Sequence, residues 1–106
     1  MPFTYQEEVN HILPAELKKM MQEGGLFQLI DVRETIEHEE KNIGGELIPL
    51  NEIFAGYERL DKDKPVIIYC KVGVRSQIAI QRLQAKYGFK NLYNLKGGIT
   101  AYLAES

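Results

Sequence analysis

The residues with the most chemical potential lie in one short segment, 70–76, which contains the single cysteine of the chain. An apolar run, 66–69, precedes this segment, and a stretch with helical spacing of apolar residues, 78–83, follows it. Open α/β sheets place their ligands at such strand-to-helix junctions. Amides of the loop and the positive end of a helix beginning near Ser76 would favour a thiolate there. The candidate active-site residues are Cys70, Lys71, Val72, Gly73, Val74, Arg75 and Ser76.

Three side chains or backbone positions of this segment have alternative roles. Gly73 can adopt backbone angles closed to other residues, which a tight loop with converging amides needs. Arg75 can offer a fork of donors to an anion, or it can anchor the loop to a carboxylate such as Glu34 or Asp31. The hydroxyl of Ser76 can cap the following helix or donate to a group attached to the Cys70 sulfur, and we expect the cap. The alternative for Cys70 is a structural role, because a lone cysteine is commonly a small buried hydrophobe. We expect the loop that contains Cys70 to lie at the protein surface.

The segment resembles the active-site loop of single-domain rhodaneses, sulfurtransferases that carry sulfur as a cysteine persulfide. Further blocks that resemble the family occur in the same order at residues 29–34, 48–50 and 95–102. Two features depart from the family pattern. Residues 43–46 read Ile-Gly-Gly-Glu where rhodaneses usually have Pro-Gly-Ala, and Tyr102 replaces a common tryptophan, for which we expect a packing role.

The resemblance implies sulfur transfer by Cys70 without a cofactor. Cys70 would take sulfane sulfur from a small donor, thiosulfate or a persulfide, and pass it to a thiol or cyanide in ping-pong fashion. The loop amides of residues 71–75 would stabilise the anionic persulfide. The alternative is a persulfide-carrier or protein-interaction module with little thiosulfate turnover, whose partner is a sulfur-carrier protein or a thioredoxin-like protein.

Phosphoryl chemistry is disfavoured by the length of the loop. Cysteine phosphatases hold a tetrahedral oxyanion in a Cys-x5-Arg loop, whereas Cys70 and Arg75 are separated by four residues. A shorter loop leaves less room for a tetrahedral anion, and a persulfide adds only one atom.

Asp31 and Arg33 follow an apolar run, 26–30, and are the candidate supporting residues of the site. In the family resemblance they border the active-site loop, and a rigid loop needs such partners. The charged segment 35–41 predicts one or two exposed helical turns. It contains His38 beside three glutamates, but contiguous residues do not share a helical face, so we expect no metal site. We expect His11 to be a surface residue.

Composition fits a single soluble domain over residues 1–106. The chain has 106 residues, a net charge of −2 and 44% hydrophobic residues, which argues against a general nucleic-acid binder. One cysteine forms no internal disulfide. The start lacks a basic, apolar signal, and no apolar run is long enough to span a membrane, so the expected location is the cytoplasm.

Alternating apolar runs and helical patterns predict an α/β fold, a rhodanese-like parallel sheet of about five strands with helices on both faces. Strands are expected at 3–10 (an edge strand), 26–30, 46–48, 66–69 and 91–95. Helices are expected at 14–22, at 51–60 with Asn51 as its cap, at 76–87 and at 99–103. The buried side of the third of these is expected to comprise Ile78, Ile80, Leu83 and Tyr87.

Overall fold

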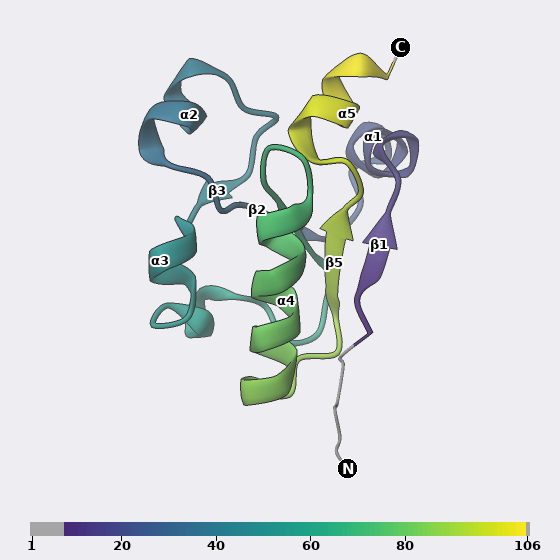
Figure 1. Cartoon of the computed structure of the whole chain (residues 1–106). Coiled ribbons are helices and arrows are strands. Elements are labelled where there is room, and N and C mark those ends of the chain that lie inside the picture. Colours follow the sequence, from purple (N-terminus) through teal and green to yellow (C-terminus); the bar gives the residue numbers. More distant parts are fainter. Residues whose placement is uncertain (1–7, 106) are drawn as a thin grey trace.

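A five-stranded parallel sheet is the centre of the computed structural model, which describes residues 8–105 (Figure 1). Its strand order is β1-β5-β4-β2-β3, so strands distant in sequence are neighbours and each crossover passes over a face of the sheet. The strands are β1 (Asn10–Ile12), β2 (Gln28–Asp31), β3 (Glu46–Leu47), β4 (Val66–Tyr69) and β5 (Leu92–Leu95).

Helices cover both faces of the sheet, as the sequence predicts. Side chains of α3 and α4 join the buried cluster on one face, and side chains of α1 and α5 join the cluster on the other. The short helix α2 lies at the end of the sheet near α5 (Figure 1). The helices are α1 (Pro14–Glu23), α2 (Thr35–Glu40), α3 (Leu50–Ile53), α4 (Val74–Tyr87) and α5 (Gly98–Ala104), and a 3-10 turn, η1, spans Tyr57–Arg59.

Strand β4 lies in the middle of the core because all of its residues are buried and apolar or aromatic. A central parallel strand is covered by helices on both sides, which explains its continuous hydrophobic run. Alternate residues serve the two faces. Ile68 packs with Leu83 of α4, and Ile67 packs with Leu17 of α1. This strand therefore fixes where its carboxyl end, and Cys70, must lie.

The predicted helix 51–60 is wrong in its extent. α3 ends at Ile53, and Pro49, not Asn51, precedes its first turn. A turn follows α3, and the chain next forms a regular helical segment in η1. Gly56 lies at the break, and glycine is a poor helix former. The predicted edge strand is displaced: among the described residues β1 runs from Asn10 to Ile12, and residues 8 and 9 are not part of it. Residues 3–7 of that prediction lie outside the described part of the chain.

Helix α4 also differs from its prediction. It begins at Val74, two residues before Ser76, and ends at Tyr87, where Gly88 with a φ of +75° follows it. Ile78 is 44% exposed, so it does not belong to the buried side. The residues that share that side are Ser76, Ile80, Leu83 and the partly buried Tyr87, at spacings of three and four. A serine thus occupies the position where the helix meets the end of β4.

Candidate active site

Cys70 lies directly after β4, and its sulfur receives two backbone amides. The amide of Gly73 lies 3.1 Å from Sγ and that of Ser76 lies 3.4 Å from it. The loop turns sharply because Gly73 has a φ of +94°, which confirms the predicted need for glycine. α4 starts at the next residue, so its positive end is directed at the same sulfur.

The pKa of the Cys70 thiol lies below its ordinary value. Burial raises this pKa, but the side-chain hydrogen bond with Ser76 and the hydrogen bonds from the amides of Ser76, Gly73 and Val72 outweigh burial and lower it. Such donors stabilise a thiolate more than a thiol. The nucleophilic form of the sulfur is therefore favoured.

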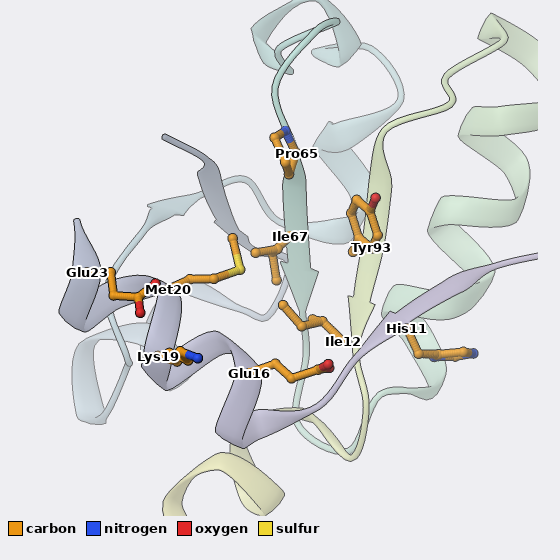
Figure 2. Close-up of a pocket in the computed structure, with 9 residues that line it drawn as sticks. All are labelled: His11, Ile12, Glu16, Lys19, Met20, Glu23, Pro65, Ile67 and Tyr93. Atoms are coloured by element: carbon orange, nitrogen blue, oxygen red, sulfur yellow. The ribbon is translucent and has the colours of Figure 1, made fainter. Parts of the chain in front are cut away.

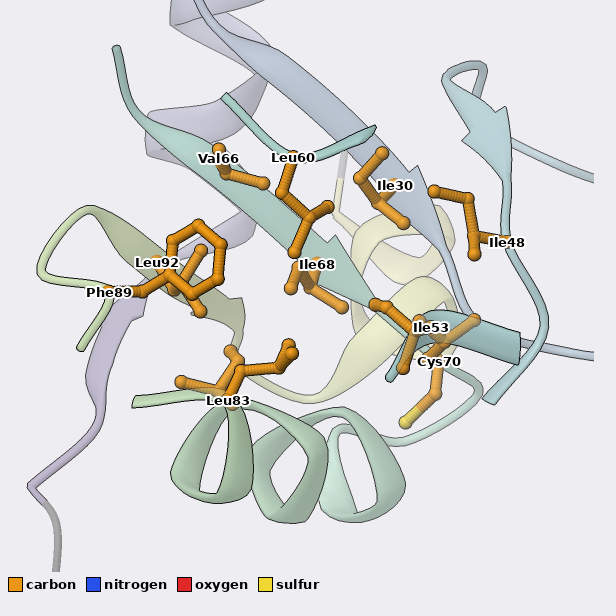
Figure 3. Close-up of a cluster of buried hydrophobic side chains, with 12 residues drawn as sticks. Ile30, Ile48, Ile53, Leu60, Val66, Ile68, Cys70, Leu83, Phe89 and Leu92 are labelled. Carbon is orange, nitrogen blue, oxygen red and sulfur yellow. The ribbon is translucent and has the colours of Figure 1, made fainter. Parts of the chain in front are cut away.

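The loop lies at the surface, as predicted from the sequence, but the cysteine within it is buried. Cys70 is only 1% exposed and is part of the buried cluster beneath α4. Figure 3 shows it beside Ile53 at one end of this cluster, with its sulfur directed toward α4. The flanking Val72 and Val74 are instead 53% and 60% exposed. The loop surrounds the sulfur and presents apolar side chains outward.

The start of α5 holds the loop from the side opposite the sulfur. The Ile99 amide donates to the Cys70 carbonyl at 2.9 Å, and the Thr100 amide donates to the Lys71 carbonyl at 3.1 Å. Gly98 passes so close that a Cβ there would collide with both carbonyls. Since these carbonyls face α5, the amides of the same peptide groups face away from it. This arrangement leaves the Val72 amide free to face the sulfur side of the loop, where it contributes to the lowered pKa of Cys70.

Ser76 does not cap α4, so that expectation is wrong. Gly73 is the N-cap residue, and it has no side chain to form a capping bond. The Ser76 hydroxyl lies 3.2 Å from the Cys70 sulfur and also donates to Oδ1 of Asn94. Because Ser76 lies within the first turn of α4, its side chain points at the end of β4. The side chain of a capping residue would instead point at the helix backbone.

Asn94 is a site residue that the sequence reasoning missed. It is 2% exposed, and its amide donates to the Gly73 carbonyl at 3.0 Å. It also lies 3.3 Å from Nδ1 of His11, an exposed residue whose side chain nevertheless contacts this network. The signal was available: Leu92 and Asn94 share one face of a buried strand, and a polar residue on such a face requires a partner.

Arg75 pairs with neither of the carboxylates proposed from the sequence. Its guanidinium lies 3.9 Å from Glu37 of α2, and both side chains are partly exposed at 42% and 29%. A pair this long and this exposed contributes little to stability. Lys71 lines a shallow hollow of about 210 Å³ together with Glu37 and Leu103. Positive charge is therefore available beside the loop.

Asp31 and Arg33 form a buried pair next to the loop and do not touch the sulfur. The Arg33 guanidinium lies 2.8 Å from the Asp31 carboxylate, and His38 Nδ1 lies 2.8 Å from the same carboxylate. Burial raises the pKa of Asp31, but hydrogen bonds from Arg33 and His38 outweigh it and hold this pKa below its usual range. The Val32 amide donates to the Tyr69 carbonyl at 3.0 Å. These residues brace the end of β4.

A larger cavity lies elsewhere in the fold. It has a volume of about 510 Å³ and is lined by Met20 of α1, Ile67 and Tyr93 (Figure 2). These side chains belong to the cluster on the α1 face, whereas Cys70 belongs to the cluster on the α4 face. The cavity therefore does not serve the sulfur.

Within residues 8–105, no group of three or more histidine, cysteine or carboxylate side chains could hold a metal ion. His38 binds a carboxylate partner instead, through the buried Asp31. None of the helices in this part of the chain is long and apolar enough to cross a membrane.

The chain belongs to the rhodanese-like domain family, whose model matches residues 13–105. It is 32% identical to the thiosulfate sulfurtransferase GlpE of Coxiella burnetii, covering 92% of this chain and 88% of that protein. It is 38% identical to the probable adenylyltransferase/sulfurtransferase MoeZ of Mycobacterium tuberculosis over 86% of this chain. Because it spans only 24% of MoeZ, the match concerns one part of that longer protein.

Solved structures of the same family share the fold. A rhodanese-related protein from Thermoplasma volcanium superposes with a TM-score of 0.78 at 26% identity, covering 92% of this chain and 93% of that one. A rhodanese-like domain protein from Staphylococcus aureus gives 0.79 at 29% identity, covering 89% and 91%. These likenesses confirm the rhodanese-like α/β fold predicted from the sequence.

Proposed function

We propose that this domain is a sulfurtransferase that carries sulfane sulfur as a persulfide on Cys70. The observation that supports this most is the convergence of the Gly73 and Ser76 amides on the buried Cys70 sulfur, at 3.1 and 3.4 Å. A site of this kind stabilises a sulfur anion in the way that an oxyanion hole stabilises oxygen. The name of the GlpE relative, thiosulfate sulfurtransferase, points to the same chemistry.

The proposed reaction has two displacement steps. The Cys70 thiolate attacks the outer sulfur of thiosulfate, the sulfur–sulfur bond of the donor breaks, and sulfite leaves with the bonding electrons. Cys70 then bears a persulfide anion, so the total charge is unchanged. In the second step cyanide or a thiolate attacks the outer sulfur and the Cys70 thiolate leaves, which restores the enzyme.

The other proposed residues assist this cycle. Lys71, Val72 and Val74 complete the loop, and Lys71 and Arg75 raise the local concentration of anionic donors. Asp31 and Arg33 keep the end of β4 rigid. The chemistry uses no metal or organic cofactor, and it involves neither nucleic acid nor a membrane. The single-domain organisation and the cytoplasmic location stay predictions.

A protein-fed carrier is the second candidate. It is favoured by the exposed Val72 and Val74 beside a Cys70 that is only 1% exposed, since exposed apolar side chains suit the centre of an interface with a protein partner. The donor or acceptor would then be a sulfur-carrier protein or a thioredoxin-like protein. The two candidates differ in saturation: a thiosulfate enzyme saturates at low thiosulfate concentration, and a protein-fed carrier does not.

The test is the intact mass of the reduced protein before and after thiosulfate, with Cys70→Ser as the matched control. The proposal predicts a gain of one sulfur atom that cyanide reverses and that the variant lacks. A gain of the same size in Cys70→Ser would reject Cys70 as the carrier. If thiosulfate adds nothing and a persulfidated protein donor does, the protein-fed carrier is the correct reading.

A further inference from the structure

Asn94 is a polar side chain placed inside an apolar layer. It belongs to β5 and pairs in register with Ile68 of β4 and His11 of β1. The neighbouring position on the same face, Leu92, is part of the buried cluster under α4. A buried amide at this position needs all of its strong hydrogen bonds supplied by specific neighbours.

Those neighbours fix which way the Asn94 amide faces. The Gly73 carbonyl can only accept, so the NH₂ group of Asn94 must point to it, at 3.0 Å. The second amide hydrogen is directed toward Nδ1 of His11 at 3.3 Å. The amide oxygen therefore faces Ser76, and an oxygen at this position requires the hydroxyl as donor.

The Ser76 hydroxyl thus has one proton and two possible acceptors, the Cys70 sulfur and the Asn94 amide oxygen. Its oxygen lies 3.2 Å from the Cys70 sulfur, close enough to donate to a thiolate. It cannot donate to sulfur and to Asn94 at once. While Asn94 holds the proton, the thiol itself is the donor to Ser76. Turning the proton to a thiolate would leave the buried Asn94 oxygen without a partner, which is costly.

We propose that Asn94 is a positioning residue of the sulfur site, which sets the direction of the Ser76 hydroxyl and thereby limits how strongly that hydroxyl can stabilise the Cys70 sulfur anion. This inference rests on the proposed function only in taking Cys70 as the reacting group. It assigns Asn94 no contact with a substrate.

The charged groups around the sulfur do not set the direction of the Ser76 hydroxyl. Lys71 adjoins Cys70 in the chain, Arg75 of α4 pairs with Glu37 of α2, and His11 of β1 reaches only the amide of Asn94. The hydrogen bonds to the sulfur involve Ser76 and the backbone amides of Gly73 and Val72, none of which carries a charge. Substitutions at Ser76 and Asn94 alone leave these charges in place.

A double-mutant cycle tests the proposal through the pH dependence of Cys70 alkylation by iodoacetamide. The four proteins are the wild type, Ser76→Ala, Asn94→Leu and the double variant, and the chain's single cysteine makes the signal unambiguous. Once Asn94 is gone, the Ser76 proton is free for the thiolate. Ser76→Ala should then raise the midpoint by about one pH unit more in the Asn94→Leu background than in the wild type.

Equal effects of Ser76→Ala in the two backgrounds, or a smaller effect in Asn94→Leu, would overturn the proposal. Asn94 would then act only through its hydrogen bond to the Gly73 carbonyl. Loss of that bond changes the loop whether or not Ser76 has a hydroxyl. The cycle isolates the pairwise contribution because it subtracts effects that each substitution has alone.

A second measurement does not depend on the folding of Asn94→Leu. The S–H stretching band of reduced Cys70 is recorded by infrared spectroscopy at a pH below the alkylation midpoint. The proposal predicts a lower frequency in the wild type, where the thiol donates to Ser76, than in Ser76→Ala. An unchanged band would contradict it. Neither experiment uses a sulfur donor, so failure of sulfur transfer would not mimic failure of this proposal.

Discussion

The amide of Ile99 donates to the carbonyl of Cys70 at 2.9 Å, so the start of α5 holds the residue whose sulfur we propose to be reactive. This bond joins α5 to the loop after β4, and its two residues are 29 positions apart in the sequence. It turns the Cys70 carbonyl away from the site and leaves the sulfur side of the loop to amide donors. Packing of α5 and ionisation of the thiol are therefore coupled.

Gly98→Ala tests this coupling, with Gly88→Ala as the matched control. Both glycines have positive φ, +64° and +75°, but a Cβ at Gly88 meets nothing within 4 Å, whereas one at Gly98 collides with the loop carbonyls. Gly88→Ala should cost about 1–2 kcal/mol in the free energy of unfolding in urea. Gly98→Ala should cost more and should also slow alkylation of Cys70. Equal stability and equal alkylation in the two variants would show that the close approach of Gly98 to the loop carbonyls is unimportant.

Loading of sulfur should depend on pH through the Cys70 thiol. The pKa of this group is lowered by its hydrogen bonds, and the thiolate is the nucleophile. The rate of persulfide formation should therefore rise with pH and level off below the ordinary titration range of a free thiol. Stopped-flow loading with thiosulfate measures this profile, and Ser76→Ala should move it to higher pH. A profile that matches a free thiol would contradict the role of the loop donors.

Asp31 should make the fold sensitive to acid. Its pKa in the folded protein is below the unfolded value, so its stabilising contribution is present above the unfolded pKa and is lost as the pH falls through the folded pKa. At neutral pH, Asp31→Asn should lower the free energy of unfolding by about 3 kcal/mol, because Arg33 is left buried without its partner.

The exposed Asp63→Asn is the control for this substitution and should change stability by less than about 0.5 kcal/mol. Urea unfolding at several pH values gives both results. In Asp31→Asn the loss of stability at acid pH should be shallower than in the wild type. The same acid dependence in Asp31→Asn and in the wild type would mean that another group controls the acid sensitivity of the fold.

Arg75 should act on the approach of the donor more than on the fold. Its pair with Glu37 is long and exposed, so Arg75→Ala should leave the free energy of unfolding almost unchanged. Loading by thiosulfate should slow by about tenfold at low salt, since a positive charge beside the loop is lost. Glu37→Ala is the control and should not slow loading. Equal slowing in both variants would instead make Arg75 an anchor of the loop.

The position of the site could be predicted from the sequence because it depends on local pattern. A buried apolar strand at 66–69, a glycine with positive φ and a following helix are enough to place Cys70 at the carboxyl end of a parallel sheet. Asp31 could be placed nearby for the same reason, since it ends the neighbouring strand.

The partners of Ser76 could not be predicted, because they depend on which strand lies beside which. Asn94 reaches the loop only because β5 lies next to β4, and His11 reaches Asn94 only because β1 pairs with β5. Arg75 finds Glu37 because the short helix α2 lies over the end of the sheet. Sequence spacing gives each element, but side-chain pairs between elements require the packed fold.

The near-complete burial of Cys70 has a consequence for how a partner could recognise the protein. Cys70 is only 1% exposed, so a partner that docks on the loop meets the exposed Val72 and Val74 and not the cysteine. If Cys70 carries sulfur as proposed, the added atom needs space beside a residue that is already packed, so loading would displace part of the loop. Loading would thus alter the shape and charge that a partner encounters, and an acceptor could distinguish a loaded domain from an empty one before any bond is exchanged.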